Sequence, residues 1–211
     1  MIQKVILALS LLLGSQLAMA QQDTYQEGIH YFKIDQIPAE TGSDTVEVTE
    51  IFSYACSHCN TIDPYIQAWS KNKPDNVVLN RIPVVFGRKA WELMARGYIA
   101  AEMMGIVEES HIAMMDAIWK QGKQFRSMDE LADFYVGFGV EKSAFIAHFQ
   151  SFALDSQLRK SQRDVQLFGI QGTPSLVVNR KYRVTSNKNV RDFDAMLNVV
   201  DFLVVKETKG P

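Results

Sequence analysis

The chain has 211 residues, of which 47% are hydrophobic and 22% charged, and its 22 Lys and Arg against 24 Asp and Glu give a formal net charge of −2. Because proteins that bind nucleic acid in general are usually basic, this balance argues against a nucleic-acid partner. The length suits one large domain or a domain with an insertion, and the apolar fraction is ample for a hydrophobic core.

The N-terminus has the pattern of an export signal. Lys4 supplies a positive charge, residues 5–13 form an apolar run, and Ala18-Met19-Ala20 is a small-residue cleavage site. The run is too short for a membrane-spanning helix. We predict cleavage after Ala20, which removes one base and no acid and changes the net charge from −2 to −3. An uncleaved apolar N-terminus is the alternative. A cleaved signal implies an oxidising compartment outside the cytoplasm.

The first β-type pattern, at residues 45–53, leads directly into Cys56-Ser57-His58-Cys59. Residues 62–71 have helix-like content, which Pro64 would kink without preventing a helix. Residues 77–86 are β-rich again. The order strand, cysteine motif, helix, strand predicts a βαβ unit with C-x-x-C at the start of its helix, which is the setting of a redox motif.

Helical patterns then follow one another, and Ser127-Met128-Asp129-Glu130 is a capping box at the start of one of them. The predicted helices cover residues 90–104, 108–121, 127–139, 143–151 and 155–168. A hairpin is predicted at 175–179 and 182–185, and a last amphipathic helix at 190–205. The fold class is therefore α/β with an all-helical insertion. We expect the first part of the α/β domain at 21–86, the insertion at 87–161 and the second part at 162–211.

The chain has only two cysteines, three positions apart. Closing so small a loop constrains the unfolded chain by roughly 2 kcal/mol, so the pair is better explained by chemistry than by stability. Zinc is the main rival, but a structural zinc site needs four ligands, and the other histidines, His30, His111 and His148, are scattered. We expect no metal and no cofactor other than a Cys56–Cys59 disulfide.

The two sulfurs are expected to differ. At the helix N-terminus, free backbone N–H groups and the helix dipole favour a Cys56 thiolate, the form that attacks disulfides. Cys59, one turn later, would be more buried and would be the resolving thiol. A protonated or dipolar His58 would lower the pKa of Cys56 further, which stabilises the reduced form and makes the protein an oxidant. An exposed, idle His58 is the alternative.

Two further pairs of residues have a structural and a functional interpretation. Thr173-Pro174 is either a trans proline that leads into an edge strand, or a cis proline whose preceding residue offers its backbone to an extended substrate. Glu50 shares strand parity with apolar neighbours, as does Arg81 on the next predicted strand. They either form a buried pair that passes protons to and from Cys59, or reach solvent.

At this point the chain resembles the DsbA family, thioredoxin-fold disulfide oxidases of the bacterial periplasm, over nearly all of its mature length. The most specific segments are EIFSYACSHC (Glu50 to Cys59) and DVQLFGIQGTPSLVVNRKY (Asp164 to Tyr182). The resemblance implies a thioredoxin fold with a helical domain inserted, Cys56 as nucleophile, Cys59 as resolving thiol and His58 as the main pKa tuner. It implies a cis Pro174 that faces the cysteines with Thr173, and Glu50 as a buried acid. Arg81 falls where the family tends to have a lysine.

Two departures from the family pattern affect the expected redox strength. Ser57 replaces the proline that is usual between the family's cysteines, and this dipeptide tunes thiolate stability. Thr173 replaces the common valine, and threonine at that place is similar to disulfide isomerases of the same superfold.

Three functions are therefore compared. The first is an oxidase that donates disulfides to reduced, unfolded exported proteins and is reoxidised by a DsbB-like membrane quinone reductase, a partner that the resemblance implies. The second is a periplasmic reductase or isomerase, and the third a chaperone-like peptide-binding module with an incidental thiol pair. A monomer is expected.

Overall fold

The computed structural model describes residues 24–35 and 45–208, so the predicted signal peptide and its cleavage site lie outside the described residues. One mixed sheet has the strand order β1-β5-β4-β2-β3. Its strands are β1 (Phe32–Lys33), β2 (Val46–Phe52), β3 (Val77–Pro83), β4 (Ser175–Val178) and β5 (Tyr182–Thr185). Strand β3, at one edge of the sheet, runs parallel to its neighbour β2, and the other neighbouring strands are antiparallel.

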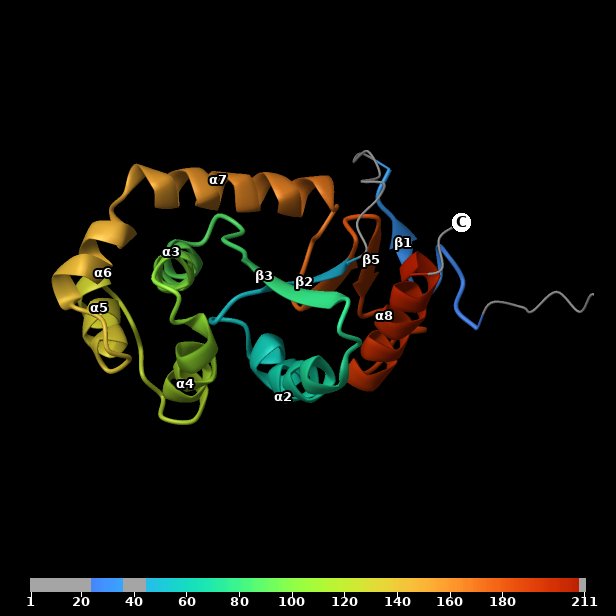
Figure 1. Cartoon of the computed structure of the whole chain (residues 1–211), viewed down its shortest axis with the longest axis horizontal. Helices are drawn as coiled ribbons and strands as arrows, with labels where there is room; N and C mark the ends of the chain where they lie inside the picture. The colour runs from blue at the N-terminus through green and yellow to red at the C-terminus, as the bar shows by residue number, and fades with distance from the viewer. Residues whose placement is uncertain (1–23, 36–44, 209–211) are drawn as a thin grey trace, which may run out of the picture.

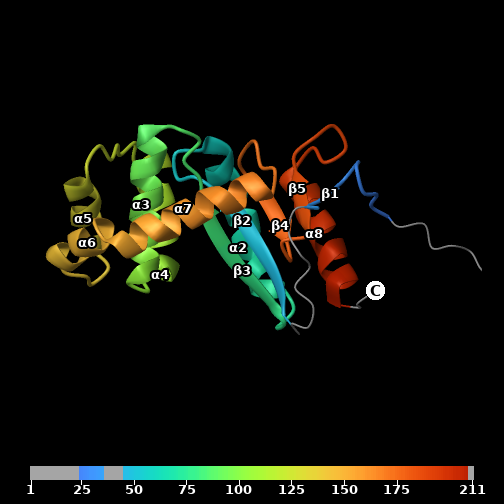
Figure 2. The same cartoon turned by 90° about the horizontal axis from the view of Figure 1, so that it is seen from above.

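Seven helices belong to the described part of the chain. They are α2 (Ser57–Asn72), α3 (Lys89–Met103), α4 (Val107–Trp119), α5 (Met128–Val136), α6 (Lys142–Phe149), α7 (Phe152–Leu167) and α8 (Phe193–Thr208). Helices α2 and α8 cover one face of the sheet and α7 crosses the other, while α3 to α6 form a separate group beside it (Figures 1 and 2). None of the described helices is long and apolar enough to cross a membrane.

The burial pattern follows these layers. One apolar cluster joins β2 to α2 and α8, and a smaller one lies between the sheet and α7. The third fills the helical group and extends to Phe52, Tyr54, Cys56 and Cys59. The end of β2 and the start of α2 therefore lie where the sheet and the helical group share a core.

The α/β class, the parallel unit around the cysteines and the run of helices between β3 and β4 are confirmed. Ser127 caps α5, because its hydroxyl accepts the Glu130 backbone N–H at 3.2 Å. The Glu130 carboxylate bonds to the backbone N–H of Arg126. Helix α2 begins at Ser57 and contains Pro64, as the position of the cysteine motif predicted. Two details differ from expectation: α8 begins three residues later than predicted, and the two-residue β1 was not predicted.

Candidate active site at the start of helix α2

The turn between β2 and α2 positions the cysteine motif. The Cys56 backbone N–H donates to the Ser53 carbonyl at 3.0 Å, and the Ala55 N–H donates to the Ser53 hydroxyl at 3.1 Å. Cys56 has an extended backbone, with φ −106° and ψ 116°, and is the N-cap residue of α2. Its sulfur therefore lies at the end of the helix where backbone N–H groups are not used within the helix.

Cys56 is the sulfur favoured as an anion. A hydrogen bond from the Cys59 thiol lowers the pKa of Cys56 to about 5, against the opposing effect of burial. A hydrogen bond with Thr173 and the backbone N–H groups of Cys59 and His58 act in the same direction. Both thiols are free, so the structure represents the reduced protein.

Cys59 has the opposite environment. It has no exposed surface, whereas Cys56 retains 8%. Its hydrogen bond to Cys56, followed by burial and the neighbouring thiolate charge, raises the pKa of Cys59 far above its ordinary value. At neutral pH the pair thus holds one proton, on Cys59, and one negative charge, on Cys56.

Ser57 and His58 are exposed in the first turn of α2. The contribution of His58 to the lowered pKa of Cys56 comes from its backbone N–H, which any residue other than proline would supply at this position. The expected role of the His58 imidazole and that of the Ser57 side chain stay predictions.

Thr173 and Pro174 lie next to the cysteine motif in space, although more than a hundred residues separate them from it in the sequence. The Thr173-Pro174 peptide bond is cis, as the resemblance implied. Cys56 Sγ lies 3.5 Å from the Thr173 carbonyl oxygen. A groove of about 850 Å³ begins here, lined by His58, the loop 169–175, Phe32, β5 and the start of α8. We call it the substrate groove, after the role that is proposed for it below.

Glu50 and Arg81 form the predicted ion pair. Their strands are parallel neighbours and the two residues are partners in the register, with Arg81 Nε 2.9 Å from Glu50 Oε2. Glu50 is fully buried, and burial raises its pKa although Arg81 acts against the shift. Glu50 Oε1 has no hydrogen-bond partner within the described part of the chain. The charge of Glu50 also contributes to the raised pKa of Cys59.

Arg81 connects this pair with solvent. Its side chain is 12% exposed. It lines a cavity of about 850 Å³ between β3 and α7, and another of about 590 Å³ between α2, β3 and α4. Two cavities therefore reach the Arg81 side of the buried pair.

A second buried polar group was missed in the sequence. His111 on α4 lies between Tyr54 and Asp63, with Nδ1 3.0 Å from the Tyr54 hydroxyl and Nε2 3.2 Å from Asp63 Oδ1. All three side chains are buried. Asp63, one helical turn after Cys59, carried a signal, because it shares the buried face of α2. Nothing in the sequence pattern indicated His111 as its partner.

Comparison with known proteins agrees with this geometry. The DSBA-like thioredoxin domain family matches residues 47–198. The thiol:disulfide interchange protein DsbA of Pseudomonas aeruginosa is 32% identical to this chain, and the match covers 97% of both chains. The protein of the same name from Azotobacter vinelandii is also 32% identical, over 92% of this chain and 90% of that one.

Two solved structures are similar throughout the fold. The crystal structure of Pseudomonas aeruginosa DsbA has a TM-score of 0.79 and 32% identity, and the match covers 88% of this chain and 96% of that one. The oxidoreductase DsbA from Xylella fastidiosa has a TM-score of 0.78 and 35% identity, over 86% and 96% respectively.

Proposed function

The chain belongs to the DSBA-like thioredoxin domain family, and from this premise we propose that its Cys56–Cys59 pair introduces disulfide bonds into other proteins. The chain is a thiol:disulfide oxidoreductase, as its relatives are. The observation that carries the proposal is the difference between the two sulfurs: the pKa is lowered for the more exposed Cys56 and raised for the buried Cys59, which supports Cys56 as the thiolate.

The reaction starts from the Cys56–Cys59 disulfide. A substrate thiolate attacks Cys56 Sγ, the S–S bond breaks, and Cys59 leaves with the electron pair and takes up a proton. A second substrate thiolate then attacks the substrate sulfur of the mixed disulfide, and Cys56 leaves as its stabilised thiolate. Two electrons pass from the substrate dithiol to the protein, and one disulfide is exchanged for another.

Glu50 and Arg81 are proposed to handle the proton of Cys59. Glu50 is near enough for its charge to act on Cys59, and a carboxyl whose pKa is raised by burial takes up a proton more readily than an ordinary one. Arg81 would hold the carboxylate in place and bring it into contact with the two cavities. His58 is proposed to stabilise the Cys56 thiolate, Ser57 to adjust its stability, and Thr173 and Pro174 to receive an extended substrate.

The remaining assignments follow from the family. We propose a periplasmic protein, exported by a cleaved signal peptide, whose redox group is the cysteine pair itself. Reduced, unfolded exported proteins would be its substrates, and a DsbB-like membrane quinone reductase would restore the disulfide. We keep the division into 21–86, 87–161 and 162–211 as the proposed domain organisation.

A glutathione titration of the redox equilibrium tests the proposed direction. We expect a potential nearer the value typical of DsbA proteins than that of thioredoxin, which differ by about 150 mV. A value near that of thioredoxin would favour the reductase or isomerase, the alternative to which Thr173 and Ser57 point. The thiolate absorbance of reduced protein should titrate with a midpoint near the pKa of about 5 given for Cys56.

A Cys56→Ser variant separates catalysis from binding. Disulfide formation in a reduced substrate should stop, because no sulfur remains in the attacked position. A variant that keeps full activity in the cell would favour the chaperone-like module. Ser70→Ala is the matched control, since it changes a serine near the other end of the same helix and leaves both sulfurs in place.

A further inference from the structure

The substrate groove carries an uneven set of charges. Two arginines, Arg183 on β5 and Arg191 before α8, line it together with one acid, Asp192. His58 lines its catalytic end. Positive side chains thus lie along the path that leads away from Cys56.

Both arginines are held without a carboxylate. Arg183 donates Nη1–H to the Phe168 carbonyl at 3.0 Å and stacks over the Phe32 ring at 5.3 Å. Arg191 is exposed and donates Nε–H to the Lys188 carbonyl at 2.7 Å. Among the described residues, neither guanidinium has an acid within ion-pair distance. These bonds fix each guanidinium while leaving most of its five N–H donors for another acceptor.

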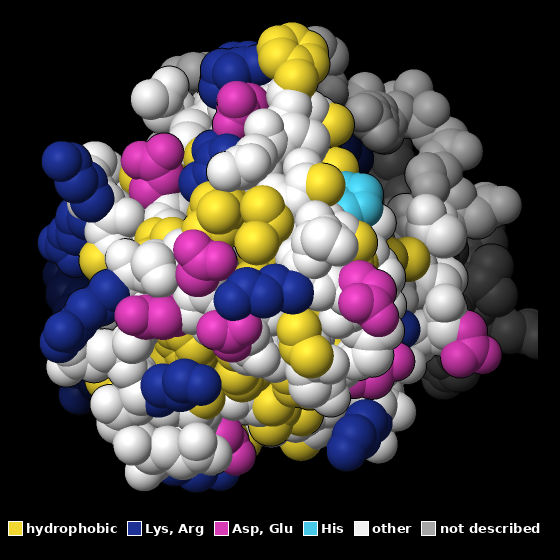
Figure 3. Space-filling view, turned by 90° about the vertical axis from the view of Figure 1, so that its left-hand side faces the viewer, with side chains coloured by type: hydrophobic (Ala, Val, Ile, Leu, Met, Phe, Trp, Pro, Cys, Tyr) yellow, Lys and Arg dark blue, Asp and Glu magenta, His cyan; other side chains and the backbone are white. Residues whose placement is uncertain are grey.

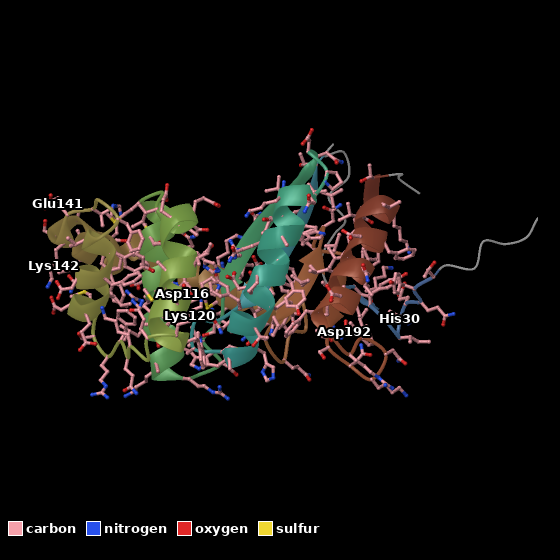
Figure 4. All side chains as sticks on the ribbon, turned by 90° about the horizontal axis from the view of Figure 1, so that it is seen from below. His30, Asp116, Lys120, Glu141, Lys142 and Asp192 are labelled. Carbon is pink, nitrogen blue, oxygen red and sulfur yellow. The ribbon has the colours of Figure 1, made fainter. Side chains whose placement is uncertain are left out.

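Asp192 does not balance this charge. Its Oδ1 accepts the Ala195 backbone N–H at 2.7 Å, so the carboxylate caps the start of α8. Figure 4 places Asp192 at that end of the helix. A carboxylate in this position is compensated by the positive end of the helix dipole, so the two arginines determine the sign of the potential in the groove.

From these charges we infer that the substrate groove selects extended polypeptide segments with acidic side chains close to the reacting cysteine. The inference rests on the proposed function and names the class of substrate that is exchanged fastest. A segment whose cysteine reaches Cys56 must pass Thr173 and Pro174, and the groove leads from there to Arg183 and Arg191. Glu or Asp side chains of the segment would pair with these arginines and would be attracted before contact.

Dithiol peptides of one sequence test the preference, with Glu, Gln or Lys at the positions two and three residues from the attacking cysteine, placed on either side of it. The second-order rate constant of disulfide transfer from oxidised protein is measured at pH 7. At low salt we expect the Glu peptide to react about fivefold faster than the Gln peptide, and the Lys peptide to be the slowest. Near 1 M salt, where the Debye length is about 3 Å, the three rates should converge.

Variants assign the preference to the groove. Arg191→Gln should remove a large part of it and Arg191→Glu should reverse it, whereas Lys142→Gln should leave it unchanged. Lys142 is a matched control for net charge, because it pairs with Asp133 at the opposite end of the molecule (Figure 4). That end carries Lys, Arg, Asp and Glu side by side (Figure 3). Arg191 is exposed, so its variants should fold.

The outcomes separate the two ideas. Equal rates for Glu and Lys peptides, or a difference that Arg191→Glu leaves unchanged, would overturn the inference and leave the proposed function intact. A failure of every peptide to exchange would reject the proposed function, and the inference with it.

Discussion

At the scale of single residues, the buried ion pair has two unequal partners. Glu50 has no exposed surface and keeps one oxygen without a hydrogen bond in the described structure, whereas Arg81 retains exposed surface beside two cavities. Burial outweighs the attraction of Arg81, because the pKa of Glu50 is raised. The unfavourable free energy of burying the pair therefore comes mainly from the carboxylate.

Glu50→Gln should stabilise the protein at pH 7 by about 1 kcal/mol, because it removes a carboxylate that is costly to bury and leaves an arginine that water reaches. A raised pKa means that the contribution of Glu50 to stability is present below its unfolded value of 4.5 and is lost as the pH rises through its folded value. The gain should therefore vanish in acid. Urea unfolding at pH 7 and pH 4 measures both values. The formation of the mixed disulfide, in which Cys59 takes up its proton, should slow about tenfold.

Arg81→Met is the contrasting variant. It leaves Glu50 buried without a counter-charge and should destabilise the protein by about 3 kcal/mol at pH 7. The loss should shrink toward pH 4, where Glu50 binds a proton. If Glu50→Gln proved the more damaging of the two at neutral pH, the assignment of the cost to the carboxylate would be wrong.

Some contacts of these residues could be predicted from the sequence and others could not. The cysteine motif was sufficient to predict that the environments of Cys56 and Cys59 differ, and strand parity indicated Glu50 and Arg81 as one of two possibilities, a buried pair. Parity gives the face of a strand, but the contact also needs the parallel register that places residue 50 opposite 81. The Asp63–His111 contact was beyond reach, because it depends on how α4 packs against α2.

At the scale of elements, that missed contact joins the catalytic helix to the helical group. Asp63 on α2, His111 on α4 and Tyr54 in the catalytic turn form one hydrogen-bonded line. Although burial alone would raise it, the pKa of Asp63 is lowered by the hydrogen bond and charge interaction with His111. The carboxylate is therefore stabilised by its contact across the two helices.

Asp63→Asn should destabilise the protein by about 1–2 kcal/mol at pH 7, because it weakens a charge-assisted hydrogen bond in a buried site. A lowered pKa means that the stabilisation is present above the unfolded value of 3.8 and is lost as the pH falls through the folded value. The variant and the unchanged protein should therefore converge at pH 2. Urea unfolding at pH 7 and pH 2 measures the difference.

Asp116→Asn, on the helix α4 that carries His111, is the control. Asp116 forms an exposed pair with Lys120 (Figure 4), so its loss should change the free energy of unfolding by less than about 0.5 kcal/mol. Equal losses for the two variants would show that burial of the α2–α4 contact adds nothing.

Element types were predictable where local signals agreed. The Ser127 cap and the turn residues Gly105 and Gly169, both with positive φ, limit three of the predicted helices. The two-residue β1 has no comparable signal, since its only support is pairing with β5. Helix α7 runs continuously through residue 161, where the sequence was expected to change domain, and the domain division stays a prediction.

At the scale of the whole molecule, the thiolate of Cys56 couples redox state to stability. Its pKa falls from 9.0 to about 5 on folding, so its contribution to the reduced protein is complete above pH 9 and lost as the pH falls through 5. At pH 7 the contribution is about 3 kcal/mol. The oxidised protein gains roughly 2 kcal/mol from the closed loop instead. The thiolate effect is the larger of the two at neutral pH.

The reduced protein should therefore be more stable than the oxidised protein at pH 7, and the order should reverse at pH 5. Between these values the difference should change by about 1.4 kcal/mol per pH unit. Guanidinium unfolding of both forms over this range measures it. A double variant, Cys56→Ser with Cys59→Ser, is the control and should show no dependence on oxidant; the same slope in that variant would contradict the assignment to Cys56.

The difference in pKa between Cys56 and Cys59 also determines which of them reacts with electrophiles. In mildly acidic solution an ordinary cysteine is protonated and unreactive, while Cys56 remains ionised and its fully buried neighbour does not. A haloacetamide or a maleimide dye added near pH 6 would modify a single atom of this chain. The difference in pKa between the two cysteines, which suits disulfide transfer, thus also allows selective covalent labelling of Cys56 without an introduced cysteine.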